Sequence, residues 1–142
     1  MILPEELIHN RILVDTDVFS FVFKKDERAH FFNPYMINRT SALSFMSVAE
    51  LYYGAYKAGW GVNSITRLEN AIKLYVILPY NYLVCQKWAS VRRQREVKGL
   101  SMSHSDIWVA ACALRHDCPL LTNNGIHFKD IDDLVVISPT FI

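Results

Sequence analysis

The 142-residue sequence has little of several features that define specialised classes of protein. Its three cysteines, Cys85, Cys112 and Cys118, form no C-x-x-C pair, which argues against a disulfide-stapled secreted fold and predicts free thiols in the cytoplasm. No apolar run approaches the roughly 18 residues of a membrane span, and the start "MILPEELIHN" lacks the basic and apolar regions of a secretory signal. A net charge of +1 provides no bulk attraction to nucleic acid, but it does not exclude a local basic patch.

Repeats, linkers and low-complexity stretches are also missing, and the length suits one domain over residues 1–142. Short apolar runs alternate with longer helical segments. We expect strands at 12–15, 42–47, 75–78, 120–122 and 134–137. We expect helices at 18–24, 27–37, 48–58, 62–74, 82–98 and 105–115. The alternation predicts a three-layer α/β fold, with a central, mostly parallel five-stranded sheet flanked by helices.

Acidic residues follow the predicted strands, where open parallel sheets bind their ligands. Asp15 and Asp17 follow the first strand in "RILVDTDVFS", Glu50 follows the second, and Asp106 opens the apolar helix "DIWVAACAL". Three carboxylates within about 5 Å would repel one another by roughly 3 kcal/mol per pair, so such a cluster persists best around a cation. Oxygen ligands select a hard ion such as Mg²⁺ or Mn²⁺, and the usual task of such an ion is phosphate chemistry.

A purely structural interpretation of the same acids is helix capping. Ser47-x-x-Glu50 and Ser103-x-x-Asp106 both fit the capping box, in which a serine and an acid satisfy free N–H groups at a helix start. Either acid of the first pair, Asp15 or Asp17, is also suited to cap the following helix. The residues taken one at a time leave capping and catalysis open.

Basic and aromatic residues give two further hypotheses about partners. The segment "KWASVRRQREVKG" predicts either a solvated helical face or an RNA-binding patch, with Arg92, Arg93, Arg95 and Lys98 as the candidate contacts. Eleven of the eighteen aromatic residues lie between Phe19 and Trp60. They predict either a groove for another chain or a locally aromatic core.

Four segments together resemble a PIN domain of the VapC toxin type over nearly the whole chain: "LVDTDVFS", "MSVAELYYGAY", "SHSDIWVAACALRHDCPLLTNNGIHF" and "DIDDLVVISP". The resemblance implies a PIN-like fold and an Mg²⁺- or Mn²⁺-dependent ribonuclease, the toxin of a toxin–antitoxin pair. Carried over by motif, it implies catalytic roles for Asp15, Glu50, Asp106 and Asn124, of which the three acids would be the metal ligands. Many family members have aspartate where this chain has Asn124. The resemblance implies supporting roles for Asp17, Thr122 and Asn123.

The resemblance also implies an RNA substrate, a VapB-like antitoxin, a second copy of the chain in a homodimer, and contact with DNA only through the antitoxin. We interpret His104 and His127 as surface or supporting residues. One alternative is a haloacid-dehalogenase-like phosphatase with Asp15 as nucleophile, although Phe19 stands where that family has a small or hydroxyl residue. A response-regulator receiver would need an aspartate after the third strand, where "YVILPYN" has none. A non-catalytic PIN-like protein that binds RNA or a partner is the third alternative.

Overall fold

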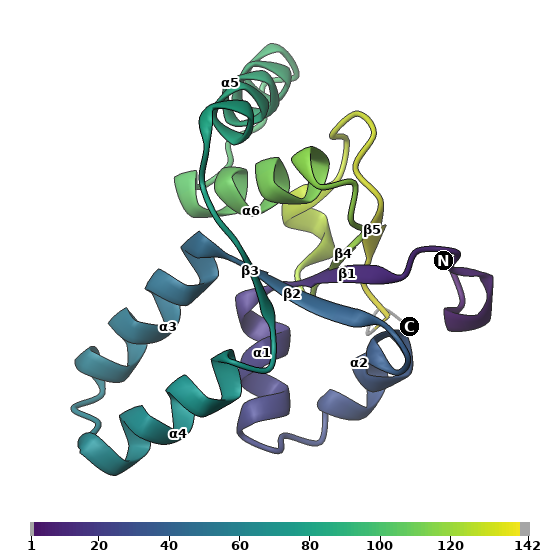
Figure 1. The fold of residues 1–142 in the computed structure, drawn as a ribbon. Coiled ribbons are helices and arrows are strands. Elements are labelled where there is room, and N and C mark those ends of the chain that lie inside the picture. The colour runs from purple at the N-terminus through teal and green to yellow at the C-terminus, as the bar shows by residue number, and fades with distance from the viewer. Residues whose placement is uncertain (1, 140–142) are drawn as a thin grey trace.

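The computed structural model describes residues 2–139, and Figure 1 shows their arrangement in three layers. All four strand pairings of the central sheet are parallel, in the order β3-β2-β1-β4-β5. The strands are β1 (Arg11–Val14), β2 (Thr40–Ser44), β3 (Val76–Leu78), β4 (Leu120–Leu121) and β5 (Val136–Ile137). The predicted three-layer α/β fold with five parallel strands is therefore confirmed.

Helices cover both faces of the sheet. In Figure 1, α5 (Tyr82–Val97) and α6 (His104–Arg115) lie above it. Four helices lie below: α1 (Thr16–Phe23), α2 (Ala29–Met36), α3 (Phe45–Lys57) and α4 (Val62–Ile72). Short 3-10 helices at Pro4–Glu6 and Gly125–Phe128 complete the described elements. No helix within residues 2–139 combines the length and the apolar character needed to cross a membrane.

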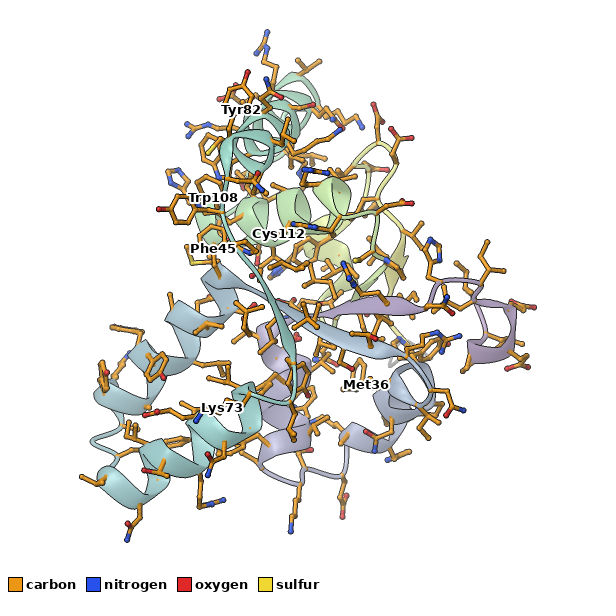
Figure 2. All side chains as sticks on the ribbon, viewed as in Figure 1. Met36, Phe45, Lys73, Tyr82, Trp108 and Cys112 are labelled. Atoms are coloured by element: carbon orange, nitrogen blue, oxygen red, sulfur yellow. The ribbon has the colours of Figure 1, made fainter. Side chains whose placement is uncertain are left out.

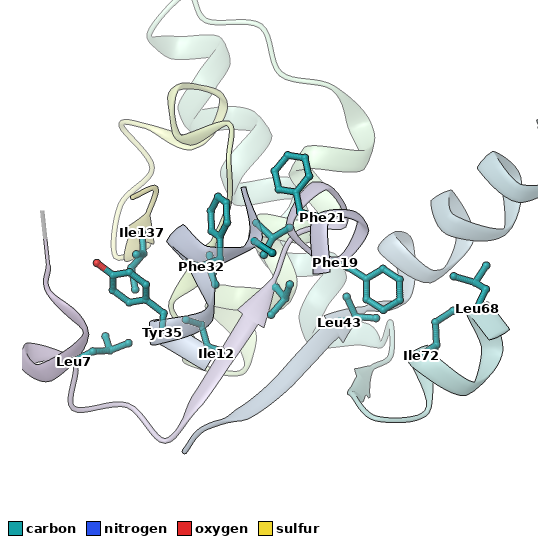
Figure 3. Close-up of a cluster of buried hydrophobic side chains, with 14 of the residues drawn as sticks. Leu7, Ile12, Phe19, Phe21, Phe32, Tyr35, Leu43, Leu68, Ile72 and Ile137 are labelled. Atoms are coloured by element: carbon teal, nitrogen blue, oxygen red, sulfur yellow. The ribbon is translucent and has the colours of Figure 1, made fainter. Parts of the chain in front are cut away.

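Strand side chains alternate between two separate cores because successive residues of a strand point to opposite faces. Ile12 and Val14 pack in the core with α1 to α4, whereas Leu13 between them packs in the core with α5 and α6. Figure 3 shows the first core, which takes up several of the clustered aromatics, namely Phe19, Phe21, Phe32 and Tyr35. On α3, by contrast, Tyr53 and Tyr56 are 66% and 67% exposed. The aromatic-rich region thus supplies both a core and an exposed aromatic surface.

The element boundaries differ from expectation mainly after β2. The strand predicted over 42–47 ends at Ser44, because the Ser44 hydroxyl accepts the Ser47 N–H at 3.0 Å and caps α3 there. The prediction that Ser47 and Glu50 form a capping box is therefore wrong. Glu50 lies in the second turn of α3. Gly59 and Gly99 follow the ends of α3 and α5 with φ of 70° and 68°, a conformation that glycine adopts without steric cost.

Candidate active site

The strand order reverses direction at β1. From β1 the chain builds β2 and β3 on one side, and it later adds β4 and β5 on the other. In open parallel sheets the crevice at such a reversal, beyond the carboxyl ends of the strands, is where ligands bind. Asp15 directly follows β1 and Thr122 directly follows β4, so both lie at this crevice.

Asp15 is the buried carboxylate at the centre of the crevice, with only 7% of its surface exposed. Its Oδ1 accepts the Thr16 N–H at 2.8 Å and so caps α1, while its Oδ2 accepts the Thr122 hydroxyl at 2.7 Å. Burial, followed by the negative charges of Asp17 and Asp106, raises the pKa of Asp15 from 3.8 to about 7. The surroundings of Asp15 therefore disfavour the charged form of its carboxyl.

Asp17 organises the segment that follows β4. Its Oδ2 accepts the Asn123 N–H at 3.2 Å and the Asn124 side-chain amide at 3.0 Å, and its Oδ1 accepts the Val18 N–H at 2.7 Å. The Asn124 N–H in turn donates to the Thr122 hydroxyl at 3.0 Å. Burial, with a smaller contribution from the charge of Asp106, raises the pKa of Asp17. The contacts agree with the supporting role expected for Asp17.

Glu50 reaches the crevice from α3 and is tied to the residue between the two aspartates. Thr16 Oγ1 donates to Glu50 Oε1 at 2.9 Å and lies 2.8 Å from Ser47 Oγ. Burial raises the pKa of Glu50, and the charge of Asp106 adds to the rise. Sequence reasoning missed Thr16, for which the available signal was its position between Asp15 and Asp17 at a helix start.

Asp106 enters from the first turn of α6, on the opposite face of the sheet. Its backbone N–H donates to Ser103 Oγ at 3.2 Å, which confirms Ser103 as the cap of α6. Its Oδ2 lies 3.4 Å from His127 Nδ1. His127 therefore belongs to the edge of the site, whereas His104 lies 3.4 Å from an Arg92 nitrogen instead.

The donor set suits a hard cation in its chemistry. The carboxylates are close enough for Asp106 to raise the pKa of Asp15, Asp17 and Glu50, and a bound cation would reverse that mutual repulsion. Within residues 2–139, no three His, Cys, Asp or Glu side chains converge closely enough to hold an ion as they stand. The carboxylates instead bond to hydroxyl and amide donors of the protein, such as Thr16 and Thr122. The site thus has oxygen ligands and uncompensated charge, with its side chains turned toward protein donors.

The basic residues of α5 divide into two kinds. Arg92 and Arg93 are exposed, and both lie near Glu96, at 3.5 and 3.6 Å. Arg95 is only 6% exposed, and its guanidinium donates to the carbonyls of Ser101 and Lys129. The expectation that Arg95 contacts RNA does not agree with this burial, because its charged group is used to hold two loops. Lys98 is exposed and donates to the carbonyl of Asp130 at 2.6 Å.

Fold and site together define an α/β protein with a carboxylate-rich crevice at the reversal point of a parallel sheet. The family model of the PIN domain matches residues 12–134. This match covers most of the chain, which therefore belongs to the PIN domain family and confirms the resemblance seen in the sequence.

Relatives and solved structures agree with this assignment. Ribonuclease VapC2 of Rickettsia felis is 25% identical over 126 residues, which cover 87% of this chain and 94% of the relative. The structure of VapBC2 from Rickettsia felis bound to a DNA fragment from its promoter has a TM-score of 0.80 at 24% identity, covering 89% of this chain and 97% of that one. VapBC-1 from nontypeable Haemophilus influenzae has a TM-score of 0.77 at 25% identity, covering 92% and 98%.

The family match disfavours the phosphatase and receiver alternatives, since neither class is a PIN domain. The roles of Asp15, Glu50, Asp106 and Asn124 stay predictions, supported by the crevice in which the structure places them.

Proposed function

We propose that this chain is an Mg²⁺- or Mn²⁺-dependent endoribonuclease and the toxin of a VapBC-type toxin–antitoxin system. The observation that carries the proposal is the buried carboxylate of Asp15, whose pKa is raised to about 7 in a crevice shared with Glu50 and Asp106. Uncompensated negative charge of this kind is costly in a folded protein and is typical of a cation site. Membership of the PIN family and relatives named ribonuclease support RNA as the substrate.

Asp15, Asp106 and Glu50 would hold the metal, and Asn124 would contribute at the edge of the site. When bound, the ion would lower the pKa of a water molecule and stabilise charge on the scissile phosphate. Glu50, whose Oε1 is fixed by Thr16, has Oε2 left to bind the ion or to orient its water.

The residues around the acids would set their orientation. The Thr122 hydroxyl fixes Asp15 and is itself held by the Asn124 N–H. Asp17 fixes the Asn123–Asn124 segment through two further bonds. Because catalytic groups must be held to within fractions of an ångström, removal of these partners is expected to lower the rate more than the affinity for RNA.

RNA contact and assembly belong to the same proposal. Exposed Arg92 and Arg93 would meet phosphates, so replacing both should flatten the salt dependence of RNA binding. The solved VapBC-1 complex supports a VapB-like antitoxin as partner. We expect any contact with DNA to be made through that antitoxin. The edge strand β3, with Val76 and Ile77 about 40% exposed, supports a homodimer. We expect these partners to meet in the cytoplasm, where free thiols such as the buried Cys112 persist.

The decisive experiment is cleavage of structured RNA in Mn²⁺ by wild type, Asp15→Asn and Asp106→Asn. The matched control is Asp132→Asn, which changes an exposed aspartate outside the crevice. We expect cleavage by wild type and the control only. Equal cleavage by all four proteins would refute the site, and tight RNA binding without cleavage by wild type would favour the non-catalytic alternative.

A further inference from the structure

A small cavity lies between the end of α5 and the start of α6, outside the carboxylate crevice. Its volume is about 210 Å³. Pockets that enclose drug-sized ligands measure roughly 300–1,000 Å³, so this cavity suits one flat group of the size of a nucleobase. The lining combines the apolar side chains of Leu100, Met102 and Ile107 with polar and charged ones, namely Ser101, His104, Arg92, Arg95 and the single acid Glu96.

Three neighbours orient the exposed Arg92 side chain at the cavity. Its guanidinium carbon lies 5.4 Å from the centre of the Trp88 ring, one nitrogen lies 3.4 Å from His104 Nε2, and Nε lies 3.5 Å from Glu96. A guanidinium plane that is already oriented loses little freedom on stacking against a base. Glu96 also lies near Arg93, so one carboxylate serves two arginines and positive charge is left over.

A line of aromatic rings connects the cavity to the end of β2. Phe45 follows β2 and lies 5.4 Å from Trp108, Trp108 lies 5.5 Å from Trp88, and Trp88 lies 5.6 Å from His104. Figure 2 shows Phe45 and Trp108 next to each other where α3 and α6 meet. Phe45, Trp88 and Trp108 are partly buried against the core of α5 and α6, so His104 and Arg92 at the cavity are the planes available to stack on a base.

The cavity and the candidate active site share the first turns of α6. His104 and Ile107 line the cavity, and Asp106 between them faces the crevice. Points on opposite sides of one helix are about 10 Å apart. A single RNA strand that crosses the carboxylates therefore passes within reach of the cavity.

We propose that the cavity between α5 and α6 binds one unpaired base of the RNA substrate, stacked against Arg92 and His104 beside the scissile bond. The inference rests on the proposed ribonuclease function and assigns to this cavity the recognition of one base next to the cut. A duplex cannot place a base in the cavity without unpairing it.

The test measures binding of a labelled 12-nucleotide single-stranded RNA and of its duplex in EDTA, where cleavage is suppressed. Each nucleotide of the single strand is replaced in turn by an abasic one. Wild type should prefer the single strand, and the abasic replacement at one position should weaken binding about tenfold. Arg92→Gln and Ser101→Leu, which removes space at the cavity rim, should weaken the intact strand about tenfold and remove the abasic effect.

Arg93→Gln is the matched control, because it removes the same charge beside the same Glu96 but does not line the cavity. It should lower affinity at low salt and keep the full abasic effect. An abasic effect that survives in both cavity variants, or equal binding of duplex and single strand, would overturn the cavity assignment. If Mn²⁺-dependent cleavage persists in that case, the proposed function stands, whereas absence of both binding and cleavage in wild type would reject both proposals.

Discussion

Replacement of Asp15 by asparagine should make the metal-free protein more resistant to unfolding at pH 8. Burial and neighbouring carboxylates raise the pKa of Asp15 from 3.8 to about 7 in the folded state. The stability that its protonated form contributes is fully present below about pH 4 and is lost as the pH rises through 7. Asparagine carries no charge, and it keeps an oxygen for the Thr16 N–H because it is itself a good helix cap.

The size of the effect follows from the shift. A rise from 3.8 to about 7 corresponds to about 4 kcal/mol at roughly 1.4 kcal/mol per pKa unit. The Thr122 hydroxyl loses its carboxylate acceptor in the variant, a cost of about 1–3 kcal/mol that is present at both pH values. The hydrogen-bond cost cancels when the two pH values are compared. Relative to Asp15→Asn, the free energy of unfolding of wild type should therefore fall by about 3–4 kcal/mol between pH 4 and pH 8.

The assay is urea unfolding in EDTA, followed by circular dichroism at pH 4 and pH 8, with Asp132→Asn as the control. The control should track wild type at both pH values, because Asp132 is exposed outside the crevice. Mn²⁺ added at pH 8 should then stabilise wild type more than Asp15→Asn. A stability difference between wild type and Asp15→Asn that does not change with pH would refute the conclusion that Asp15 is an uncompensated buried charge.

Three further predictions concern other contacts. Thr16→Val removes the hydroxyl that holds Glu50 and should lower the RNA cleavage rate about tenfold with unchanged RNA affinity, and Thr16→Ser should restore the rate. Burial raises the pKa of Cys112 to about 12, so iodoacetamide at pH 8 should label exposed Cys85 quickly and Cys112 only after unfolding, as mass spectrometry would show. Arg39→Met breaks four hydrogen bonds to carbonyls of α2 and the N-terminal segment, and should lower the free energy of unfolding by about 2–3 kcal/mol and speed proteolysis of that segment.

The fold was predictable because its signals are local. Short apolar strands bounded by polar residues, with helices between them, predict a parallel sheet without knowledge of any contact. The prediction failed at Ser44, where two serines three residues apart compete to cap one helix. Both Ser44 and Ser47 satisfy local capping rules, and the packing of the Phe45 ring against Trp108 is a contact between distant segments that the sequence pattern does not contain.

The acids of the site were predictable, but the bonds that orient them were not. Asp15, Glu50 and Asp106 each follow a strand or open an apolar helix, which is a positional signal. The Thr16 bond to Glu50 joins residues 34 positions apart, and the pair of His127 with Asp106 joins the 3-10 helix at Gly125–Phe128 to the first turn of α6. Arg95 was also mispredicted for lack of information on distant contacts. Its charge alone predicts exposure, but the loops at Ser101 and Lys129 bury it.

Capping and catalysis were alternatives in the sequence, but at Asp15 the cap that the structure shows is compatible with the proposed catalytic role. Its Oδ1 closes the first turn of α1 and its Oδ2 accepts Thr122, so both rotatable angles of the side chain are fixed by the fold. These bonds keep the Asp15 carboxylate at the sheet edge, and the stability lost by burying its charge would be recovered when the acids turn from their protein donors to a bound ion. The capping bond therefore serves the proposed function, because it places the charge at the end of β1 and keeps it there before any ligand arrives.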